Sequence, residues 1–413
     1  MTRRRFPLPL AAAALLPAVP APGKGAAPLR ITGIRTTEVR SVVTGKGLVL
    51  PWDPRMTPQD TRDYVFVQIF TNQGLVGTTV DGDYQLPPGI GREVQSRAEA
   101  YFIGKDPFAI EVHNREFFQK QKAPVRLFFL EVALWDIIGK ALGQPLYRLW
   151  GASTNRVRPY AATVHFSKTA EQRAEDALRF RELGFPAIKL RLHAMTEEAD
   201  LALPRKVMDA VRGTMDVMVD ANQAGKRAGD PPPVWDAGRA LRTARALEDM
   251  GLFWLEEPLH RFAYEDLARV RASLKTMHLA GGEGNVGLAD FATMLRKGAF
   301  SYLQPDPMIG GPVSVIRKIA AAAEAFGVPF GPHHGKSGVG MLVNLHMQCA
   351  APNSGYLEYM YDPGFWNPEG FQVGFAAPWP VDRSGYVQAP EKPGLGAPWD
   401  RAFFRKHGLQ WET

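Results

Sequence analysis

Short apolar runs recur through the second half of the chain, and several of them end in an acidic residue. The stretches VMVD, FWLE and LAGGE place acids at Asp220, Glu256 and Glu283. An apolar run of this length is typical of a strand buried on both faces, as in a parallel sheet. The acids are 36 and 27 residues apart, which is close to one strand–helix unit. The pattern predicts an α/β fold of the (β/α)8 type, a TIM barrel, with the acids at the carboxyl ends of neighbouring strands.

Amphipathic stretches alternate with these strands, as a barrel requires. AEQRAEDALRFRELGF, WDAGRALRTARALEDMGL and VSVIRKIAAAAEAFGV have helical periodicity, and each leads through a glycine towards an apolar run. The alternation predicts a barrel domain over residues 155–362. After residue 363 the periodicity fades into loops rich in Pro and Gly, and we expect the segment 363–413 to pack back on the N-terminal part of the fold.

A different pattern occupies residues 30–150 and predicts a separate α+β unit. Residues 31–42 and 64–70 have the apolar alternation of strands, and Thr-Asn-Gln-Gly at 71–74 predicts a hairpin turn after the second. The stretch 128–142, FFLEVALWDIIGKAL, is apolar on nearly every side and predicts a buried helix.

The first 25 residues have the pattern of an export signal. Arg3, Arg4 and Arg5 precede an apolar run, residues 7–21, that is too short to span a bilayer and ends in small residues and prolines. The Arg-Arg-x-Phe core predicts the twin-arginine route, and therefore an exported, periplasmic protein. A disordered basic N-terminus is the alternative explanation of the same residues.

Composition excludes several classes of protein. The single cysteine, Cys349, excludes an intrachain disulfide and a cysteine-based metal cluster. The net charge of +7 falls to +4 without the three N-terminal arginines, and the other basic residues are scattered and form no nucleic-acid-binding motif. No later segment reaches the ~18 apolar residues of a membrane span. We therefore expect a small anionic molecule as the partner, and neither nucleic acid nor membrane.

Ionisable residues follow most of the predicted strands, in addition to the three acids. Lys189 and Arg191 end AIKLR, Asp306 follows YLQP, His333 follows VPFGP, and Glu358 lies in YLEY. Because the carboxyl ends of barrel strands surround the active site, we expect all of these side chains to converge.

The three acids at the first strand ends indicate a metal site. Three carboxylates in one pocket repel each other and cannot all stay ionised without a counter-charge. A divalent cation supplies that charge, and ligation by oxygen alone favours Mg²⁺ over zinc or copper. We therefore expect Mg²⁺ as the cofactor.

Taken together, these stretches resemble the enolase superfamily, and within it the mandelate racemase subgroup of acid-sugar dehydratase type. The similar stretches are IKLRL, VMVDAN, FWLEEPL, LAGGE, LQPDPMIGG, PHHGKSGVG and YLEY, and the resemblance covers residues 30 to 400 approximately. It implies a TIM barrel covered by an N-terminal α+β capping domain. It also implies that loops 45–60 and 81–89, with Trp52 and Tyr84, close over the barrel mouth and select the substrate, although these aromatic residues could equally pack on the surface.

The resemblance implies a role for each ionisable residue. His333 and Asp306 correspond to a general acid/base pair, and Glu358 to a group that donates a hydrogen bond to the substrate carboxylate. The residues that correspond to Mg²⁺ ligands are Asp220, Glu256 and Glu283.

One position departs from the family pattern. Lys189 matches the first lysine of the Lys-x-Lys pair, whereas the second lysine, the usual base, is Arg191 here. Alternate residues of a strand share a face, so both side chains point into the barrel mouth. We expect a dication and a guanidinium to lower the pKa of Lys189 and make it usable as a base, while Arg191 stays protonated and positions the substrate. Alternatively, the two cations only neutralise the carboxylates. His334 points away from the site if His333 points into it.

The common step that these residues support is abstraction of a proton α to a carboxylate, with Mg²⁺ stabilising the ene-diolate. If His333 then protonates a departing β-hydroxyl, an acid sugar becomes a 2-keto-3-deoxy acid. Racemisation or epimerisation needs a second base on the opposite face, and Arg191 is a poor one. We therefore predict a Mg²⁺-dependent lyase that dehydrates an acid sugar, with a racemase or epimerase of an α-hydroxy acid as the alternative.

Two other classes fit less well. An exported carbohydrate-acid-binding protein would not need the full carboxylate set or the Asp306–His333 pair. An unrelated barrel hydrolase would usually bring histidine-rich metal ligation, which this sequence lacks. We expect a homo-oligomer, since barrels of this family commonly assemble.

Overall fold

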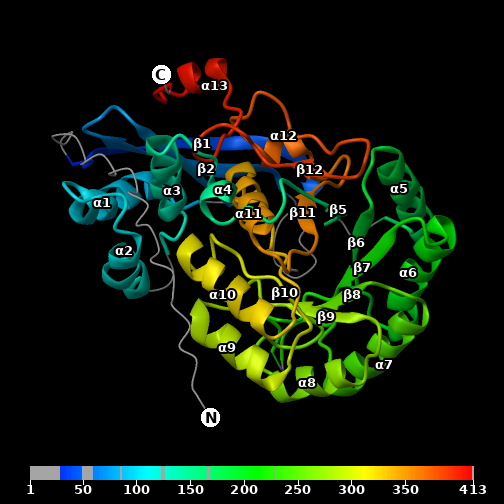
Figure 1. Cartoon of the computed structure of the whole chain (residues 1–413). Coiled ribbons are helices and arrows are strands. Elements are labelled where there is room, and N and C mark those ends of the chain that lie inside the picture. The colour runs from blue at the N-terminus through cyan, green and yellow to red at the C-terminus, as the bar shows by residue number, and fades with distance from the viewer. Residues whose placement is uncertain are drawn as a thin grey trace, which may run out of the picture.

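The computed structural model describes most of the chain (Figure 1). The described residues are 28–48, 59–83, 86–121, 126–164, 168–227 and 229–411. The export signal that we predict in residues 1–25, and the loop residues Trp52 and Tyr84, lie outside the described residues and stay predictions.

An antiparallel sheet forms the N-terminal unit. Its strands are β1 (Ile31–Leu48), β2 (Gln59–Thr71) and β3 (Val76–Asp83), in the order β1-β2-β3. Phe70 pairs with Val76 across the turn between β2 and β3, which confirms the predicted hairpin.

Helices cover this sheet. The predicted buried helix is α3 (Leu130–Ala141), which is buried at most of its positions and packs against β3. The other helices of this part of the chain are α1 (Ile90–Phe102), α2 (Ile110–Glu116), the short 3-10 helix η1 (Phe118–Lys120) and α4 (Leu146–Leu149).

Seven parallel strands form the second sheet, which curls into a half-barrel of TIM-barrel-like form (Figure 1). Their order is β10-β9-β8-β7-β6-β5-β11, so most strands that are consecutive in sequence are neighbours in the sheet. The strands are β5 (Pro159–Ala162), β6 (Ala187–Arg191), β7 (Asp216–Asp220), β8 (Trp254–Glu256), β9 (His278–Gly281), β10 (Tyr302–Leu303) and β11 (Leu357–Met360).

The strand that we expect before His333 is reduced to one residue. Phe330 makes isolated parallel bridges to Leu303 at the end of β10 and to Ser354 shortly before β11. Pro329 and Pro332 flank this position, and because proline has no N–H to donate, the strand cannot extend in either direction.

Helices on the outside of the curled sheet confirm the predicted alternation. The three helical stretches singled out in the sequence are α5 (Ala170–Glu182), α7 (Ala237–Asp249) and α10 (Val313–Ala325). Gly184, Gly251 and Gly327 follow them with positive φ angles of 95°, 82° and 67°, as helix-ending glycines do. The remaining helices of this layer are α6 (Glu197–Val211), α8 (Tyr264–Ala272), α9 (Gly287–Lys297) and α11 (Gly338–Ala350).

Aromatic rings fill the interior of the curled sheet below the ionisable residues. The ring centroid of Trp254 lies 5.2 Å from that of Tyr160 and 4.8 Å from that of Tyr302. All three side chains are buried, so the sheet encloses a packed core and not a channel.

The C-terminal segment lies against the N-terminal sheet. The ring of Phe66 on β2 packs 5.5 Å from Phe403 and 6.2 Å from Trp399, and Tyr64 donates a hydrogen bond to the Gly370 carbonyl (2.6 Å). The regular elements after the barrel are α12 (Pro368–Phe371), β12 (Val387–Gln388), which pairs with β4 (Arg156–Val157), and α13 (Arg401–Lys406). Among the described residues no helix is both long and apolar enough to cross a bilayer.

A buried carboxyl group links the N-terminal unit to the barrel. Glu131 on α3 accepts hydrogen bonds from the backbone N–H (2.7 Å) and the hydroxyl (2.8 Å) of Ser314, in the first turn of α10. Glu131 is fully buried, and burial raises its pKa to about 7 in spite of these hydrogen bonds. The folded protein therefore holds a proton here that the unfolded chain releases above its usual value of 4.5.

This proton predicts a pH dependence of stability. Glu131 contributes most to the free energy of unfolding below pH 4.5. This contribution is lost as the pH rises to about 7, because over that range only the folded state keeps the proton. The loss in free energy of unfolding is about 3 kcal/mol. In Glu131→Gln this part of the slope should disappear. Urea unfolding of both proteins between pH 5 and 7.5 measures it, with Glu111→Gln, an exposed glutamate of α2, as the control. Equal slopes for wild type and Glu131→Gln would contradict the assignment.

Candidate active site

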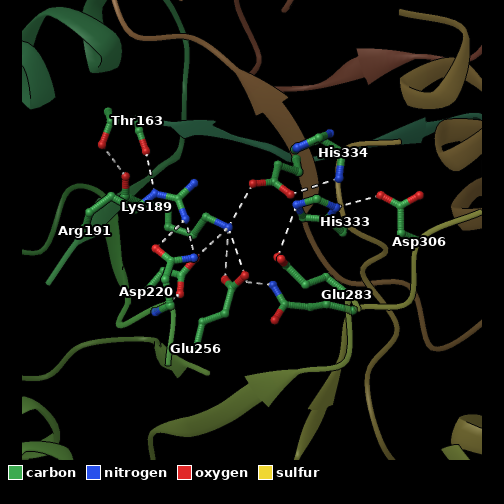
Figure 2. Close-up of polar contacts among 12 residues, drawn as sticks. Thr163, Lys189, Arg191, Asp220, Glu256, Glu283, Asp306, His333 and His334 are labelled. Atoms are coloured by element: carbon green, nitrogen blue, oxygen red, sulfur yellow. Dashed lines mark hydrogen bonds and ion pairs between the residues drawn. The ribbon is translucent and has the colours of Figure 1, made fainter. Parts of the chain in front are cut away.

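The carboxyl ends of the curled sheet bring all eight predicted site residues together. Figure 2 labels seven of them, all except Glu358. Asp220, Glu256 and Glu358 lie at or near the ends of β7, β8 and β11, and Lys189 and Arg191 lie on β6. The parallel register sets Arg191 beside Asp220, and Asp220 beside Glu256. The three others follow the ends of their strands in the next loop and are Glu283, Asp306 and His333.

Three carboxylates form the candidate metal centre. One oxygen atom from each of Asp220, Glu256 and Glu283 lies within 4.8 Å of the others. An octahedral Mg²⁺ ion with bonds of about 2.1 Å separates its ligand oxygens by about 3 to 4 Å, so one ion can bridge this set. Asp220 and Glu256 are fully buried, whereas the Glu283 side chain is 24% exposed, so the centre opens on the side of Glu283.

Lys189 stands among the carboxylates (Figure 2). Its Nζ lies 3.0 and 3.1 Å from the two oxygens of Glu256 and 2.8 Å from Oε1 of Glu358. Burial alone would lower the pKa of Lys189, but the charges of Glu256 and Glu358 outweigh burial and raise it. Carboxylates thus outweigh burial and Arg191 around Lys189, whereas the expected lowering of its pKa depends on the charge of a bound dication and stays a prediction.

Arg191 is committed to Asp220. Its Nη1 donates to Asp220 Oδ2, and its Nε donates to the Thr163 carbonyl (2.8 Å). Burial opposes its charge, but Asp220 and the neighbouring glutamates raise the pKa of Arg191 above its usual value. Both cations of β6 thus stay protonated.

The charge of the cluster matches a dication. Four carboxylates, those of Asp220, Glu256, Glu283 and Glu358, face the two cations of β6, which leaves an excess of two negative charges if every group is ionised. Burial and repulsion from the neighbouring carboxylates raise the pKa of Glu256 to about 7. An oxygen-only donor set with this excess fits Mg²⁺.

His333 and Asp306 form the predicted pair. Nδ1 of His333 lies 2.6 Å from Oδ2 of Asp306, and Nε2 lies 3.2 Å from Oε2 of Glu283. Burial would lower the pKa of His333, but Glu283, Glu358 and Asp306 raise it to about 10. The imidazole is therefore held by one carboxylate while its other nitrogen faces the candidate metal centre.

His334 has a different set of contacts. Its backbone N–H donates to Glu358 Oε2 (3.0 Å), and its Nδ1 accepts from the Lys336 N–H (2.8 Å). Ligand atoms of Asp306, His333 and His334 also lie within 4.8 Å of one another. That group includes two imidazoles, whereas the carboxylate triad offers oxygen ligands alone, which suit Mg²⁺ better, so the triad is the better candidate for Mg²⁺.

Glu358 is ionised in this arrangement. Burial opposes its charge, but Lys189 and His333 lower its pKa to about 2. The resemblance implies a Glu358 that donates a hydrogen bond, which requires a protonated carboxyl group. Here the carboxylate accepts from Lys189 and from the His334 N–H, and the donor role that the resemblance implies stays a prediction.

Sequence reasoning placed Asn222 on the face of Asp220 but missed two other polar residues that orient the cluster, Gln304 and Thr163. Gln304 donates to Glu256 Oε2 (2.9 Å), and Asn222 donates its backbone N–H to Asp220 Oδ1 (2.8 Å). Thr163 binds the Lys189 carbonyl through its hydroxyl (2.7 Å). Gln304 lies two residues from a predicted site residue and so shares its face on an extended chain, which is the signal that could have found it.

Two sequence families match the chain. The family described as Enolase C-terminal domain-like matches residues 172–403, and the family described as Mandelate racemase / muconate lactonizing enzyme, N-terminal domain, matches residues 36–151.

Several characterised relatives match over most of the chain. It is 30% identical to the arabinonate dehydratase of Saccharolobus solfataricus over 343 residues, which cover 81% of this chain and 87% of that protein. It is 28% identical to the D-xylonate dehydratase of Haloferax volcanii, over 85% of this chain and 86% of that one. It is 29% identical to the D-galactarolactone cycloisomerase of Agrobacterium fabrum, over 77% and 83% of the two chains.

Solved structures share the fold. A member of the enolase superfamily from Polaromonas sp. superposes with a TM-score of 0.75 at 24% identity, over 93% of this chain and 98% of that chain. A racemase from Streptomyces coelicolor with bound magnesium gives a TM-score of 0.74 at 24% identity, over 92% and 99%. Together with the two family matches, these likenesses establish that the chain belongs to the enolase superfamily, in the branch of mandelate racemase and muconate lactonizing enzyme.

Proposed function

We propose that this protein is a Mg²⁺-dependent lyase that removes water from an acid sugar and yields a 2-keto-3-deoxy acid. The observation that carries the proposal is the asymmetry of the site. Two cations on β6 are each paired with buried carboxylates, and one imidazole, that of His333, lies against Glu283 on the exposed side of the cluster. A site with one acid/base group suits elimination, whereas inversion at the α-carbon needs two.

The proposed reaction uses His333 twice. In its neutral form, Nε2 of His333 takes the proton from the carbon next to the substrate carboxylate. The electron pair of that C–H bond moves onto the substrate carboxylate and gives an ene-diolate. The pair then forms a double bond to the β-carbon as the bond from the β-carbon to its hydroxyl breaks. His333 returns the proton to the departing hydroxyl, so water leaves, and the enol that remains becomes a 2-keto acid.

The other residues hold charge in place during these steps. Asp306 accepts from Nδ1 of His333 and keeps Nε2 directed at the substrate. Lys189 and Arg191 supply positive charge where negative charge develops on the substrate carboxylate. When bound to Asp220, Glu256 and Glu283, Mg²⁺ would stabilise the ene-diolate and offset the carboxylate charge that raises the pKa of His333.

Relatives of this chain support the same class of reaction. The arabinonate and D-xylonate dehydratases, which match over more than four fifths of the chain, remove water from acid sugars according to their names. The match to the D-galactarolactone cycloisomerase supports a second candidate function for this site, isomerisation of a sugar-acid derivative. This candidate stands beside the racemase or epimerase alternative.

Several structural and cellular features belong to the same proposal. Phe330 bridges Leu303 at the end of β10 and Ser354 shortly before β11. These two bridges support an eighth strand position that closes the barrel. Assembly into a homo-oligomer and export by the twin-arginine route remain predictions from the sequence.

The central prediction concerns His333. We expect the purified protein with Mg²⁺ to convert at least one acid sugar into a 2-keto-3-deoxy acid, and His333→Asn to lower kcat by about 100- to 10,000-fold, since Asn cannot shuttle a proton. Product formation is followed by NMR in D₂O over a panel of acid sugars and α-hydroxy acids. A chelator should abolish turnover and Mg²⁺ should restore it.

The control is His407→Asn, which changes a histidine at the end of α13, away from the site. It should leave turnover unchanged, and His333→Asn should still bind Mg²⁺ as tightly as the wild type. Deuterium at the α-carbon of an unconverted hydroxy acid, without loss of water, would instead establish a racemase or epimerase. No turnover with any acid of the panel, with Mg²⁺ bound, would count against the proposed function.

A second prediction concerns Arg191. Arg191→Lys creates a Lys-x-Lys pair, and lysine, unlike arginine, can lose its proton and act as a base. We expect exchange of the α-hydrogen with D₂O to rise at least about tenfold relative to dehydration. Arg191→Met, which keeps bulk and removes charge, should lower both rates and leave their ratio unchanged. An unchanged ratio in Arg191→Lys would show that this position does not decide the outcome.

A further inference from the structure

The turn that carries His333 is bonded to the catalytic pair at several points. It comprises residues 333–337, and within it Gly335 donates its N–H to Asp306 Oδ2 (3.2 Å). The Lys336 N–H donates to Nδ1 of His334 (2.8 Å). Gly335 and Lys336 both have positive φ angles, 72° and 61°. Such a conformation is usual for glycine and rare for lysine, so contacts outside the turn must hold Lys336 in it.

Those contacts come from strand β3 of the N-terminal sheet. Nζ of Lys336 lies 3.2 Å from Oδ1 of Asp81 and 3.4 Å from Oδ2 of Asp83. The next residue, Ser337, donates its hydroxyl to the Val80 carbonyl (3.0 Å) and also accepts from the Gly340 N–H at the start of α11. The turn is thus tied to three positions near the end of β3, namely Val80, Asp81 and Asp83.

Strand β2 approaches the same turn. Nη2 of Arg62 donates to the Lys336 carbonyl (3.2 Å). Gly82, between the two aspartates, makes the close approach possible, because a Cβ there would lie 2.4 Å from the Tyr64 ring and 3.2 Å from the Lys336 carbonyl. The end of β3 and the His333 turn are therefore packed against each other without space for a larger residue.

The ion pair differs from an ordinary surface pair in its burial. The side chains of Lys336 and Asp81 are 20% and 17% exposed. A second lysine also joins the N-terminal unit to the barrel: Nζ of Lys318 on α10 lies 2.7 Å from Glu111 on α2, but these side chains are 45% and 64% exposed. Exposed pairs contribute little to stability, so Lys318 provides a matched control.

We propose that Lys336 is a positioning residue that couples the end of capping strand β3 to His333. Its ammonium group holds the turn to Asp81 and Asp83. The turn then fixes His333 against Asp306 and Glu283. The kinetic consequence of this inference rests on the proposed function, whereas its structural consequence does not.

The structural test measures hydrogen exchange by mass spectrometry on the full chain. Lys336→Met removes the charge and still places a non-glycine residue at the positive φ angle of position 336. In this variant amide exchange should accelerate in segments 78–83 and 333–340 together, while the melting temperature stays close to that of the wild type. Asp81→Asn, which leaves the turn untouched, should accelerate the same two segments. Lys318→Met should accelerate neither. Unchanged exchange in both segments in Lys336→Met and Asp81→Asn would overturn the coupling.

The kinetic test uses an acid sugar that the wild type dehydrates. We expect Lys336→Met to lower kcat by about 10- to 100-fold and to change KM by less than about threefold, because a displaced acid/base group slows the chemical step more than substrate binding. Lys336→Arg, which can still pair with the aspartates, should recover most of kcat. The double variant Lys336→Met/Asp81→Asn should be no slower than the slower single variant, since both act through one pair.

The outcomes separate this inference from the proposed function. A wild type that dehydrates no acid sugar, with exchange coupled as expected, would count against the proposed function and leave the link between β3 and the turn standing. Active dehydration with kcat unaffected in Lys336→Met, or equal losses in Lys336→Met and Lys318→Met, would overturn the positioning role.

Discussion

Repulsion between carboxylates at one end of a parallel sheet is the constraint on which the rest of the site depends. Asp220, Glu256 and Glu358 are buried, where charges interact several times more strongly than in water. Lys189 pairs with two of these groups and Arg191 with the third, so both cations of β6 are committed to balancing charge. The carboxylates alone favour the protonated form of both groups. We therefore propose His333 as the acid/base group, because it has its own carboxylate partner, Asp306.

Local patterns in the sequence predicted most of the fold. Helical periodicity and a terminal glycine identified α5, α7 and α10, and the turn residues after β2 identified the hairpin to β3. The strand predicted before His333 was too long. Pro329 and Pro332 interrupt the apolar run there, and only Phe330 makes β-bridges. An apolar run indicates that a segment is buried, but strand pairing also needs a backbone N–H at each bonded position. A buried run that contains prolines can therefore fail to form a strand.

The position of each site residue was predictable, but its charge state was not. Spacing and strand ends brought Lys189 and Glu358 to the right place, since every parallel strand delivers its carboxyl end to the same edge. The pKa of Lys189 is raised, and that of Glu358 lowered, by a contact of 2.8 Å between residues that are far apart in the sequence. Whether a lysine faces a cation or a carboxylate depends on distances of this kind across the sheet, and no periodicity encodes them. Gln304 was missed for a simpler reason, since a neutral amide at a strand end does not stand out among charges.

The single-residue bridge at Phe330 has a consequence for how such a site can diverge. The candidate metal ligands lie at or just after the ends of β7, β8 and β9, which are joined by regular ladders. His333 instead follows Phe330, which makes only isolated bridges to its neighbours. His333 is placed by loop contacts, such as its own N–H to the Pro305 carbonyl, and not by a strand ladder. The acid/base residue and the carboxylate cluster are thus positioned by separate sets of backbone contacts. An architecture divided in this way allows one scaffold to acquire new reactions without rebuilding its electrostatic centre.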